Sequence, residues 1–401
     1  VIRIGVRCGP SREELEVGFE SCRPASGLGA RSAAVSRYPG GRRSAFAWRG
    51  DMDLYDETTF QSVEGLERTL ALGARYRVPQ TMFLSTRLSL DEAEAGSWAR
   101  HYGIDRGAAR IPAFAAWVRE QVDLRHSAPY PTRTGKRFVL ELGNHGHLHY
   151  GTDTSGSEHN GWKRKARFGA GPYPWVTPGA TSFEEQRDNG IEARRLCEVH
   201  LGFSPRSWAL PDRTNDASTA AALEAVGCEV LSGSDVTAWH NVVVQPPPHH
   251  PPGTKSVELS VRHPGDPLTL SHVEMFRFWL HRGHRLGIPV VFMGHQHLHQ
   301  GRGSACLALT ERVLRLVLTG FRGDFHVDTV FGVGKYWREV LSGETRSVTV
   351  SVIGGDVVVR NRGDLDLKDL PVDVEAEGPA RFCVLCDVPA GEFLRLSGKD
   401  G

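Results

Sequence analysis

The chain has 401 residues, of which 40% are hydrophobic and 24% charged, and its formal net charge is +1. This composition is that of an ordinary globular protein with a sizeable core, and the near-neutral balance gives no reason to expect a nucleic-acid partner. No apolar run approaches the roughly 20 residues that cross a bilayer, so we expect no membrane span.

Strands and helices are predicted to alternate over most of the chain. This alternation predicts a mainly parallel sheet with helices outside it. After Gly343 the pattern changes, because valines alternate on both sides of Gly354-Gly355 and predict a β-hairpin. In chain order the predicted strands cover 2–6, 45–48, 78–85, 138–142, 208–211, 229–232, 289–293 and 325–330, and the predicted helices cover 58–72, 107–125, 182–200, 219–226, 271–285 and 308–319.

The segment directly after the strand at 138–142 reads Gly-Asn-His-Gly-His-Leu-His, residues 143–149. Three imidazoles in five positions favour metal binding, and His145 and His149, four apart, share one face of a helical turn. A hydrolytic metal also needs an acidic ligand and an open position. Asp51 and Asp53 follow another predicted strand, and the carboxyl ends of parallel strands gather at one rim. One of them can complete an Asp–His–His set, which leaves the other as a general base.

These motifs resemble those of the polysaccharide deacetylases with a NodB-homology domain, carbohydrate esterase family four. The resemblance runs from about Ala45 to Trp337. It implies a distorted (β/α) barrel of the NodB-homology type with a small C-terminal all-β domain. The expected parts are an N-terminal extension packing on the barrel (1–44), a deacetylase domain (45–344) with long insertions at about 86–137 and 150–181, and a small β-sandwich-like domain (345–401). The motifs are Arg49-Gly-Asp-Met-Asp53, the strand from Val78, Gly143–His149, the segment from Leu223 to Asp235, and Phe292-Met-Gly-His295.

The resemblance also implies removal of an N-acetyl group from an amino sugar or an N-acetylated saccharide. One divalent metal ion is expected on Asp53, His145 and His149. Zinc is favoured, and cobalt, nickel or another divalent ion are alternatives. Asp51 is the expected base and His295 the expected acid, with Asp235 maintaining the charge of His295. The residues expected to contact substrate are Trp162, Tyr173, Trp175, Trp208, Pro211 and His297.

The sequence departs from the family pattern at three points. Met52 separates the two aspartates, so their roles as base and ligand could be exchanged. The arginine that orients the base is missing from its expected place at 208–211, which leaves Arg206 or Arg213 as substitutes. His295 lies one residue further from its leading apolar residue than in the family pattern, so His297 is an alternative acid.

Two other functions are compatible with the same residues. A calcineurin-like metallophosphoesterase carries Gly-Asp, Gly-Asn-His and Gly-His-x-His, as here from Gly50 to His297, but this chain has no Asp-x-His before Asp51. A carbohydrate-binding protein on a decayed deacetylase scaffold would bind sugar without turnover. The odd, scattered set of seven cysteines and the absence of a leader-like segment favour the cytoplasm over secretion.

Overall fold

The chain folds into two compact units. In the computed structural model, unit 2 contains residues 45–322 and 327–335, and unit 1 contains 1–44, 323–326 and 336–401. The structure describes residues 3–6, 29–35, 37–52, 63–84, 86, 140–146, 182–202, 204–209, 218–233, 247–262, 268–295, 299, 304–376 and 381–397.

A closed parallel barrel forms the centre of unit 2. Each strand pairs in parallel with the next, and β3 pairs with both β4 and β9, which closes seven strands into a ring. The sheet is extended beside β3 by β10 (Phe325–Val327). The expected distorted (β/α) barrel is therefore confirmed. Its strands are β3 (Ser44–Met52), β4 (Gln80–Leu84), β5 (Leu140–Asn144), β6 (Ser207–Ala209), β7 (Val230–Gly233), β8 (Val257–Arg262) and β9 (Val290–His295).

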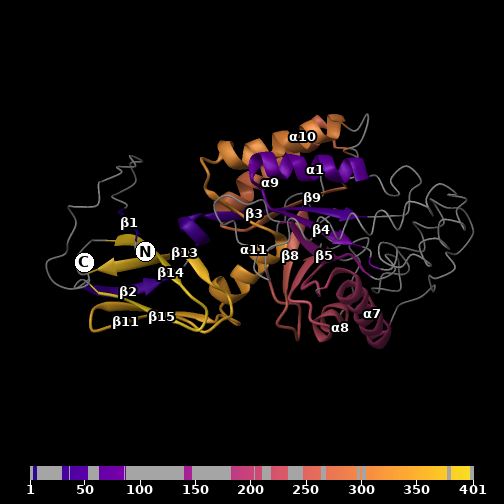
Figure 1. Cartoon of the computed structure of the whole chain (residues 1–401). Coiled ribbons are helices and arrows are strands. Elements are labelled where there is room, and N and C mark those ends of the chain that lie inside the picture. Colours follow the sequence, from indigo (N-terminus) through magenta and orange to yellow (C-terminus); the bar gives the residue numbers. More distant parts are fainter. Residues whose placement is uncertain are drawn as a thin grey trace, which may run out of the picture. The chain divides into compact units, whose positions relative to one another are not determined.

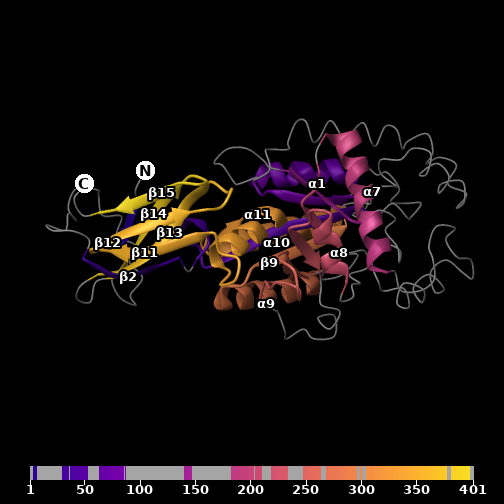
Figure 2. The same cartoon turned by 90° about the horizontal axis from the view of Figure 1, so that it is seen from below.

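Helices cover the outside of the barrel (Figures 1 and 2). The helix α10 contacts both α1 and α9 on one side, and α7 packs with α8 on another. A capping box between Ser182 and Glu185 begins α7, as their spacing predicts. The bounds are α1 (Val63–Tyr76), α7 (Phe183–Leu201), α8 (Thr219–Ala225), α9 (Leu270–Leu286), α10 (Ser304–Arg315) with a π-helical turn over Leu316–Gly320, and α11 (Val330–Tyr336) with another over Trp337–Leu341.

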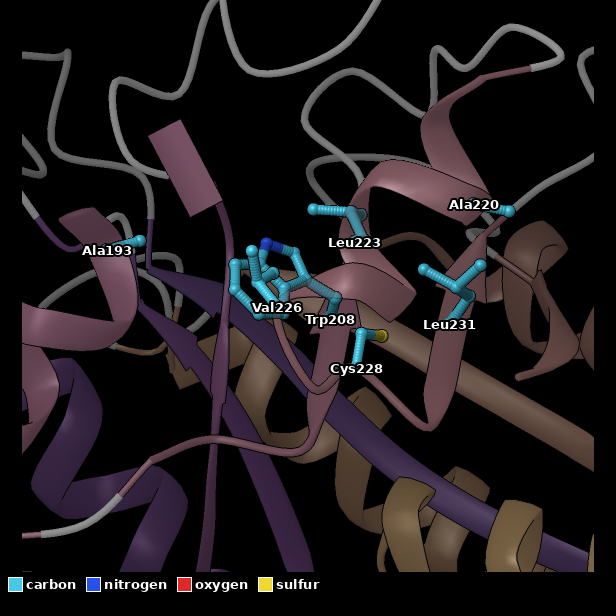
Figure 3. Packing of buried hydrophobic residues seen from close by; sticks show 7 residues of the cluster. All are labelled: Ala193, Trp208, Ala220, Leu223, Val226, Cys228 and Leu231. Carbon is cyan, nitrogen blue, oxygen red and sulfur yellow. The ribbon is translucent and has the colours of Figure 1, made fainter. Parts of the chain in front are cut away.

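Alternation along each strand sends every second side chain outward to these helices. Trp208 of β6 is one of the outward residues. It is 2% exposed and packs among side chains of α7, α8 and β7, as Figure 3 shows. The prediction that Trp208 contacts substrate is therefore wrong, because the tryptophan fills the core between the barrel and its helices. Its partners are Ala193, Ala220, Leu223, Val226, Cys228 and Leu231.

A buried carboxyl group lies on the inner wall of the barrel. Glu141 of β5 accepts hydrogen bonds from the Thr81 hydroxyl at 2.8 Å and from the Ser207 hydroxyl. It also accepts one from the backbone N–H of Phe331 at 3.0 Å, while the N–H of Val330 donates to Thr81 Oγ1 at 2.9 Å. The first turn of α11 is thus bound to the inner wall. Burial raises the pKa of the Glu141 carboxyl, against the opposing effect of these hydrogen bonds.

Unit 1 contains two antiparallel sheets, with the strand orders β1-β14-β13-β2 and β11-β12-β15. They contact each other through β2 and β11. The predicted hairpin is β11–β12, turning at Gly354 and Gly355 with φ of 61° and 86°, and the small C-terminal all-β domain is confirmed. The bounds are β1 (Arg3–Val6), β2 (Ala30–Ala34), β11 (Val348–Ile353), β12 (Asp356–Asn361), β13 (Leu367–Ala376), β14 (Arg381–Val388) and β15 (Phe393–Leu396), with a 3-10 turn over Pro39–Gly41.

The N-terminal strands form one sheet with C-terminal strands. β1 pairs with β14 and β2 pairs with β13, and the expected packing of residues 1–44 on the barrel stays a prediction. Backbone hydrogen bonding to the two edges of that sheet assigns these strands to unit 1, together with the C-terminal strands. The reason is that an edge strand offers a row of unpaired N–H and C=O groups, which another strand can satisfy.

Some regions that the sequence analysis predicted are not among the described residues. The helix at 107–125 and the insertions at about 86–137 and 150–181 lie outside the described residues, apart from Thr86. Among the helices that the structure describes, none is long and apolar enough to cross a membrane.

Replacement of Gly143 by alanine should destabilise the barrel. A Cβ there would lie 2.3 Å from the Phe83 ring and 2.7 Å from Ser207 Oγ, so we expect Gly143→Ala to lower the free energy of unfolding by about 1–3 kcal/mol through overpacking. Urea unfolding measures this loss. Gly294→Ala is the control, because a Cβ at Gly294 meets nothing within 4 Å. Equal effects of the two substitutions would contradict the packing.

Titration of Glu141 should make stability fall as pH rises. Its folded-state pKa is raised above an ordinary value of about 4.3, so between these two values the folded chain binds more protons than the unfolded chain. The contribution of Glu141 to stability is fully present below its unfolded-state pKa and is lost as pH rises through its folded-state pKa. The stability difference between wild type and Glu141→Gln should therefore decline with pH in urea titrations.

The matched control for this titration is Glu198→Gln. Glu198 is exposed, and hydrogen bonds from Ser204 and then Arg194 lower its pKa. The contribution of Glu198 to stability should be lost as pH falls. The stability difference between wild type and Glu198→Gln should therefore rise with pH, opposite to that for Glu141. A difference for Glu141 that does not vary with pH would contradict the buried carboxyl.

Candidate active site

Three predicted site residues lie at the carboxyl ends of the barrel strands. Asp51 is near the end of β3, and the parallel ladder pairs it with His295, the last residue of β9. His145 directly follows β5, and its backbone N–H donates to the Leu84 carbonyl at the end of β4 at 2.7 Å. The rim of the barrel therefore brings these three side chains to the place where parallel barrels carry their active sites.

The Asp51 carboxylate is buried and held by an arginine of its own strand. Arg49 Nη2 donates to Asp51 Oδ2 at 2.5 Å, and Arg49 Nη1 donates to the Ser232 carbonyl of β7 at 2.5 Å. The two side chains are 0% and 3% exposed. The guanidinium carbon also lies 5.1 Å from the centre of the Phe83 ring. A buried charge is stable only when it is paired and hydrogen-bonded, so the two residues form one unit.

The hydrogen bonding of His145 determines its tautomer. Ring Nδ1 lies 3.1 Å from the Ala209 carbonyl, and a carbonyl only accepts, so Nδ1 carries the hydrogen. Nε2 lies 3.7 Å from Asp51 Oδ2, and in the neutral ring this nitrogen presents a lone pair. A histidine whose other nitrogen donates to a backbone carbonyl has the arrangement commonly found in metal ligands.

Two glycines explain the local path of the chain at this histidine. Gly143 has no room for a side chain between Phe83 and Ser207. Gly146 has φ of 82°, a left-handed conformation that glycine adopts without strain, and its carbonyl accepts from the Thr86 N–H at 3.1 Å. Glycine therefore stands where β5 passes close to Phe83 and Ser207, and again where the backbone becomes left-handed directly after His145.

His299 is buried and bound to two helices. Its Nδ1 lies 2.5 Å from Thr69 Oγ1 of α1, and its Nε2 lies 3.1 Å from Thr310 Oγ1 of α10. The Thr69 hydroxyl donates to the Gly65 carbonyl, so the Thr69 oxygen accepts from the histidine. His299, the last histidine of the histidine-rich run 295–299, is therefore bound to both α1 and α10.

Most of the other predicted site residues lie outside the part of the chain that the structure describes. Among the described residues, no group of three or more His, Cys, Asp or Glu side chains could hold a metal ion, and two of the three expected ligands are not among those residues. The predicted residues outside them are Asp53 and His149 for metal, Asp235 and Arg213 for catalysis, and Trp162, Tyr173, Trp175, Pro211 and His297 for substrate.

Arg206, one of the two substitutes for the orienting arginine, lies just before β6. It forms an ion pair with Glu229, which Lys335 also contacts at 3.2 Å, and its guanidinium carbon lies 5.1 Å from the centre of the Phe331 ring. These contacts are at the amino ends of the strands. They place Arg206 at the opposite end of the barrel from Asp51.

The arginine beside Asp51 belongs to the sequence motif, although the sequence alone gave it no role. The sequence feature that could have indicated its pairing is the two-residue spacing between Arg49 and Asp51, because alternate residues of a strand share one face. That spacing puts both side chains on the inner face of β3, where burial forces them to pair.

Comparison with known proteins gives structural neighbours but no sequence match. No protein-family model matches the chain, and no curated protein matches it. A protein assigned as a polysaccharide deacetylase from Mycobacterium smegmatis is 16% identical, with a TM-score of 0.49 over 81% of this chain and 100% of its own. A second protein so assigned, from Pseudomonas aeruginosa PAO1, is 14% identical, with a TM-score of 0.46 over 75% of this chain and 92% of its own. The Puue allantoinase is 14% identical, with a TM-score of 0.44 over the same shares. The first two bear the name of the family that the sequence motifs resemble.

Loss of the His299 ring should weaken the attachment of α1 to α10. We expect His299→Leu to lower the free energy of unfolding by about 1–3 kcal/mol, because two buried hydroxyl groups lose their partner. His281→Leu, on the exposed face of α9, should change it by no more than about 0.5 kcal/mol. Thermal unfolding of the two variants tests this difference. A His299 variant as stable as the His281 variant would contradict the role of this histidine as an anchor.

Proposed function

We propose that this chain is a metal-dependent hydrolase that removes an N-acetyl group from an amino sugar or an N-acetylated saccharide. The observation that supports this best is the group at the barrel rim. A buried carboxylate, held by a guanidinium, faces the Nε2 atom of His145, and His295 stands beside it in register. These residue types are those that amide hydrolysis by activated water requires.

The donor groups fit one divalent metal ion. His145 is fixed with its hydrogen on Nδ1, so Nε2 is the nitrogen that would bind the ion. Asp53 and His149 would complete the set, since they follow β3 and β5 by one and five residues. When bound, such an ion polarises an acyl carbonyl and makes water more acidic. Zinc is our first choice, and cobalt, nickel or another divalent ion also suits the set.

Asp51 would act as the general base. Because Arg49 occupies Oδ2 at 2.5 Å, the carboxylate is oriented before substrate arrives. The attacking water loses its proton to Asp51 as its oxygen bonds to the acyl carbon. We assign Asp53 to the metal for the same reason, since Asp51 is already bound by an arginine that a metal ion would repel.

His295 would act as the general acid. It stands beside Asp51 in the parallel ladder, so the donor and the acceptor of protons flank the same reacting carbon. The C–N bond breaks as His295 gives a proton to the leaving nitrogen, which yields a free carboxylate and an amine. Asp235 would keep His295 charged, and Arg213 and His297 are further candidates near this step.

The substrate class follows from the family resemblance and the composition of the segment at 150–181. Trp162, Tyr173 and Trp175 carry rings that stack on the apolar faces of sugars, and Pro211 follows the last residue of β6 by two positions in the sequence. We assign these residues to the saccharide. A carbohydrate or amino-sugar substrate is thus the expected partner.

Acetate release tests the reaction. Purified protein loaded with zinc should release acetate from N-acetylglucosamine oligomers, and a chelator should abolish the release. His145→Ala should lose both bound zinc and activity. Asp51→Asn should keep the zinc yet lose about 100- to 10,000-fold in rate, the usual range for a general base. The control is His281→Ala on the exposed face of α9, which should keep both.

Other outcomes would replace this proposal. Wild-type turnover by His145→Ala, or turnover that is indifferent to chelator, would exclude the assigned metal site. Release of phosphate from a phosphomonoester would favour the metallophosphoesterase. Saturable oligosaccharide binding without acetate release would favour a carbohydrate-binding protein on a decayed scaffold.

A further inference from the structure

We infer that Arg49 is the positioning residue for the catalytic carboxylate of Asp51, an inference that rests on the proposed function. The sequence resemblance expects an orienting arginine near 208–211, where this chain has Trp-Ala-Leu-Pro. The structure supplies a guanidinium at the base from the base's own strand, two residues earlier. The chain therefore keeps the arginine–carboxylate pair while the arginine comes from a different strand of the barrel.

The contacts of Arg49 cross the barrel lumen. Its side chain starts on β3, and Nη1 reaches the Ser232 carbonyl on β7 at 2.5 Å, while Nη2 binds Asp51 Oδ2 at 2.5 Å. Two strands that are not neighbours in the sheet thus fix one guanidinium. Because both Nη groups are engaged in different directions, the plane of the guanidinium has little freedom to rotate, and the carboxylate it binds is held in turn.

The surroundings favour arginine over lysine at this position. The guanidinium lies against the Phe83 ring at 5.1 Å, and Nη2 lies 3.6 Å from Met293 Sδ. A planar, weakly hydrated cation suits such an apolar site, and its donors reach two acceptors at once. A lysine ammonium in the same place is a compact, strongly hydrated charge that would not reproduce both contacts.

The groups that face Asp51 define the electrostatics of the base. In the part of the chain that the structure describes, they include Arg49 on β3, His145 after β5 and, by register, His295 on β9. Arg49 is the one permanent cation among them. Its loss would leave the buried carboxylate without a paired charge and without the donor that orients it.

Steady-state kinetics of zinc-loaded Arg49 variants test this role. Arg49→Met should lower kcat by about 10- to 100-fold, the range found for groups that orient residues at a metal site, with a smaller change in KM. Arg49→Lys, which keeps the positive charge, should recover part of kcat.

The matched control is Arg262→Met. Arg262 on β8 is also a buried arginine over an aromatic ring, 5.6 Å from the centre of Trp279, but it lies on the helix-facing side of the barrel. Its loss should lower the unfolding temperature and leave kcat and KM in place. If folded Arg49→Met had the kcat of wild type, the positioning role would be overturned.

A second measurement decides the pairing even if no substrate is turned over. The unfolding temperatures of Arg49→Met, Asp51→Asn and the double variant form a thermodynamic cycle. Arg49→Met should lower the unfolding temperature strongly when residue 51 is aspartate, because the buried carboxylate is then unpaired. It should lower the unfolding temperature much less in the Asp51→Asn background, where residue 51 carries a neutral amide. Additive shifts would overturn the pairing. Absence of acetate release by wild type with strong coupling would instead overturn the proposed function alone.

Discussion

The site depends on the requirement that charges inside a closed barrel be paired. The inner face of β3 carries Arg49 and Asp51 one above the other, and both side chains are almost fully buried. Desolvation of either charge alone would cost several kcal/mol. The ion pair is therefore the condition under which a carboxylate can stay ionised at this rim, and the carbonyl of Ser232 satisfies the guanidinium on the other side of the lumen.

The same requirement shapes the other polar groups of the barrel. Deeper in the barrel, Glu141 accepts from two hydroxyl groups and from the first turn of α11, and at the rim His145 donates to the Ala209 carbonyl. Glu141 and His145 have different roles. Glu141 is buried and holds a helix in place, whereas His145 keeps Nε2 directed at the Asp51 carboxylate. One barrel thus has a polar interior that stabilises it and a polar rim suited to chemistry.

Much of the fold could be predicted from the sequence, because periodicity reports which face of an element is buried. The alternation of strands and helices predicted a parallel sheet with helices outside it, and the family resemblance predicted the barrel. The Ser182–Glu185 spacing predicted the start of α7, and the valine pattern predicted the hairpin β11–β12. Long-range pairing could not be predicted, so the sequence did not indicate that β1 and β2 pair with β14 and β13. Trp208 was misassigned because its role depends on which face of a three-residue strand it occupies. The role of Arg49 emerged only when the strand paired, since no spacing indicates a contact with Ser232 across the lumen.

The central claim is that one metal ion binds at the rim beside His145, with Asp51 kept out of its ligand set by Arg49. Anomalous scattering from a zinc-soaked crystal tests this most directly. The account predicts a single peak about 2.1 Å from His145 Nε2, with Asp53 and His149 as the other protein ligands and Asp51 still bound to Arg49. Two peaks bridged by Asp51, or no peak at the rim of the barrel, would contradict it.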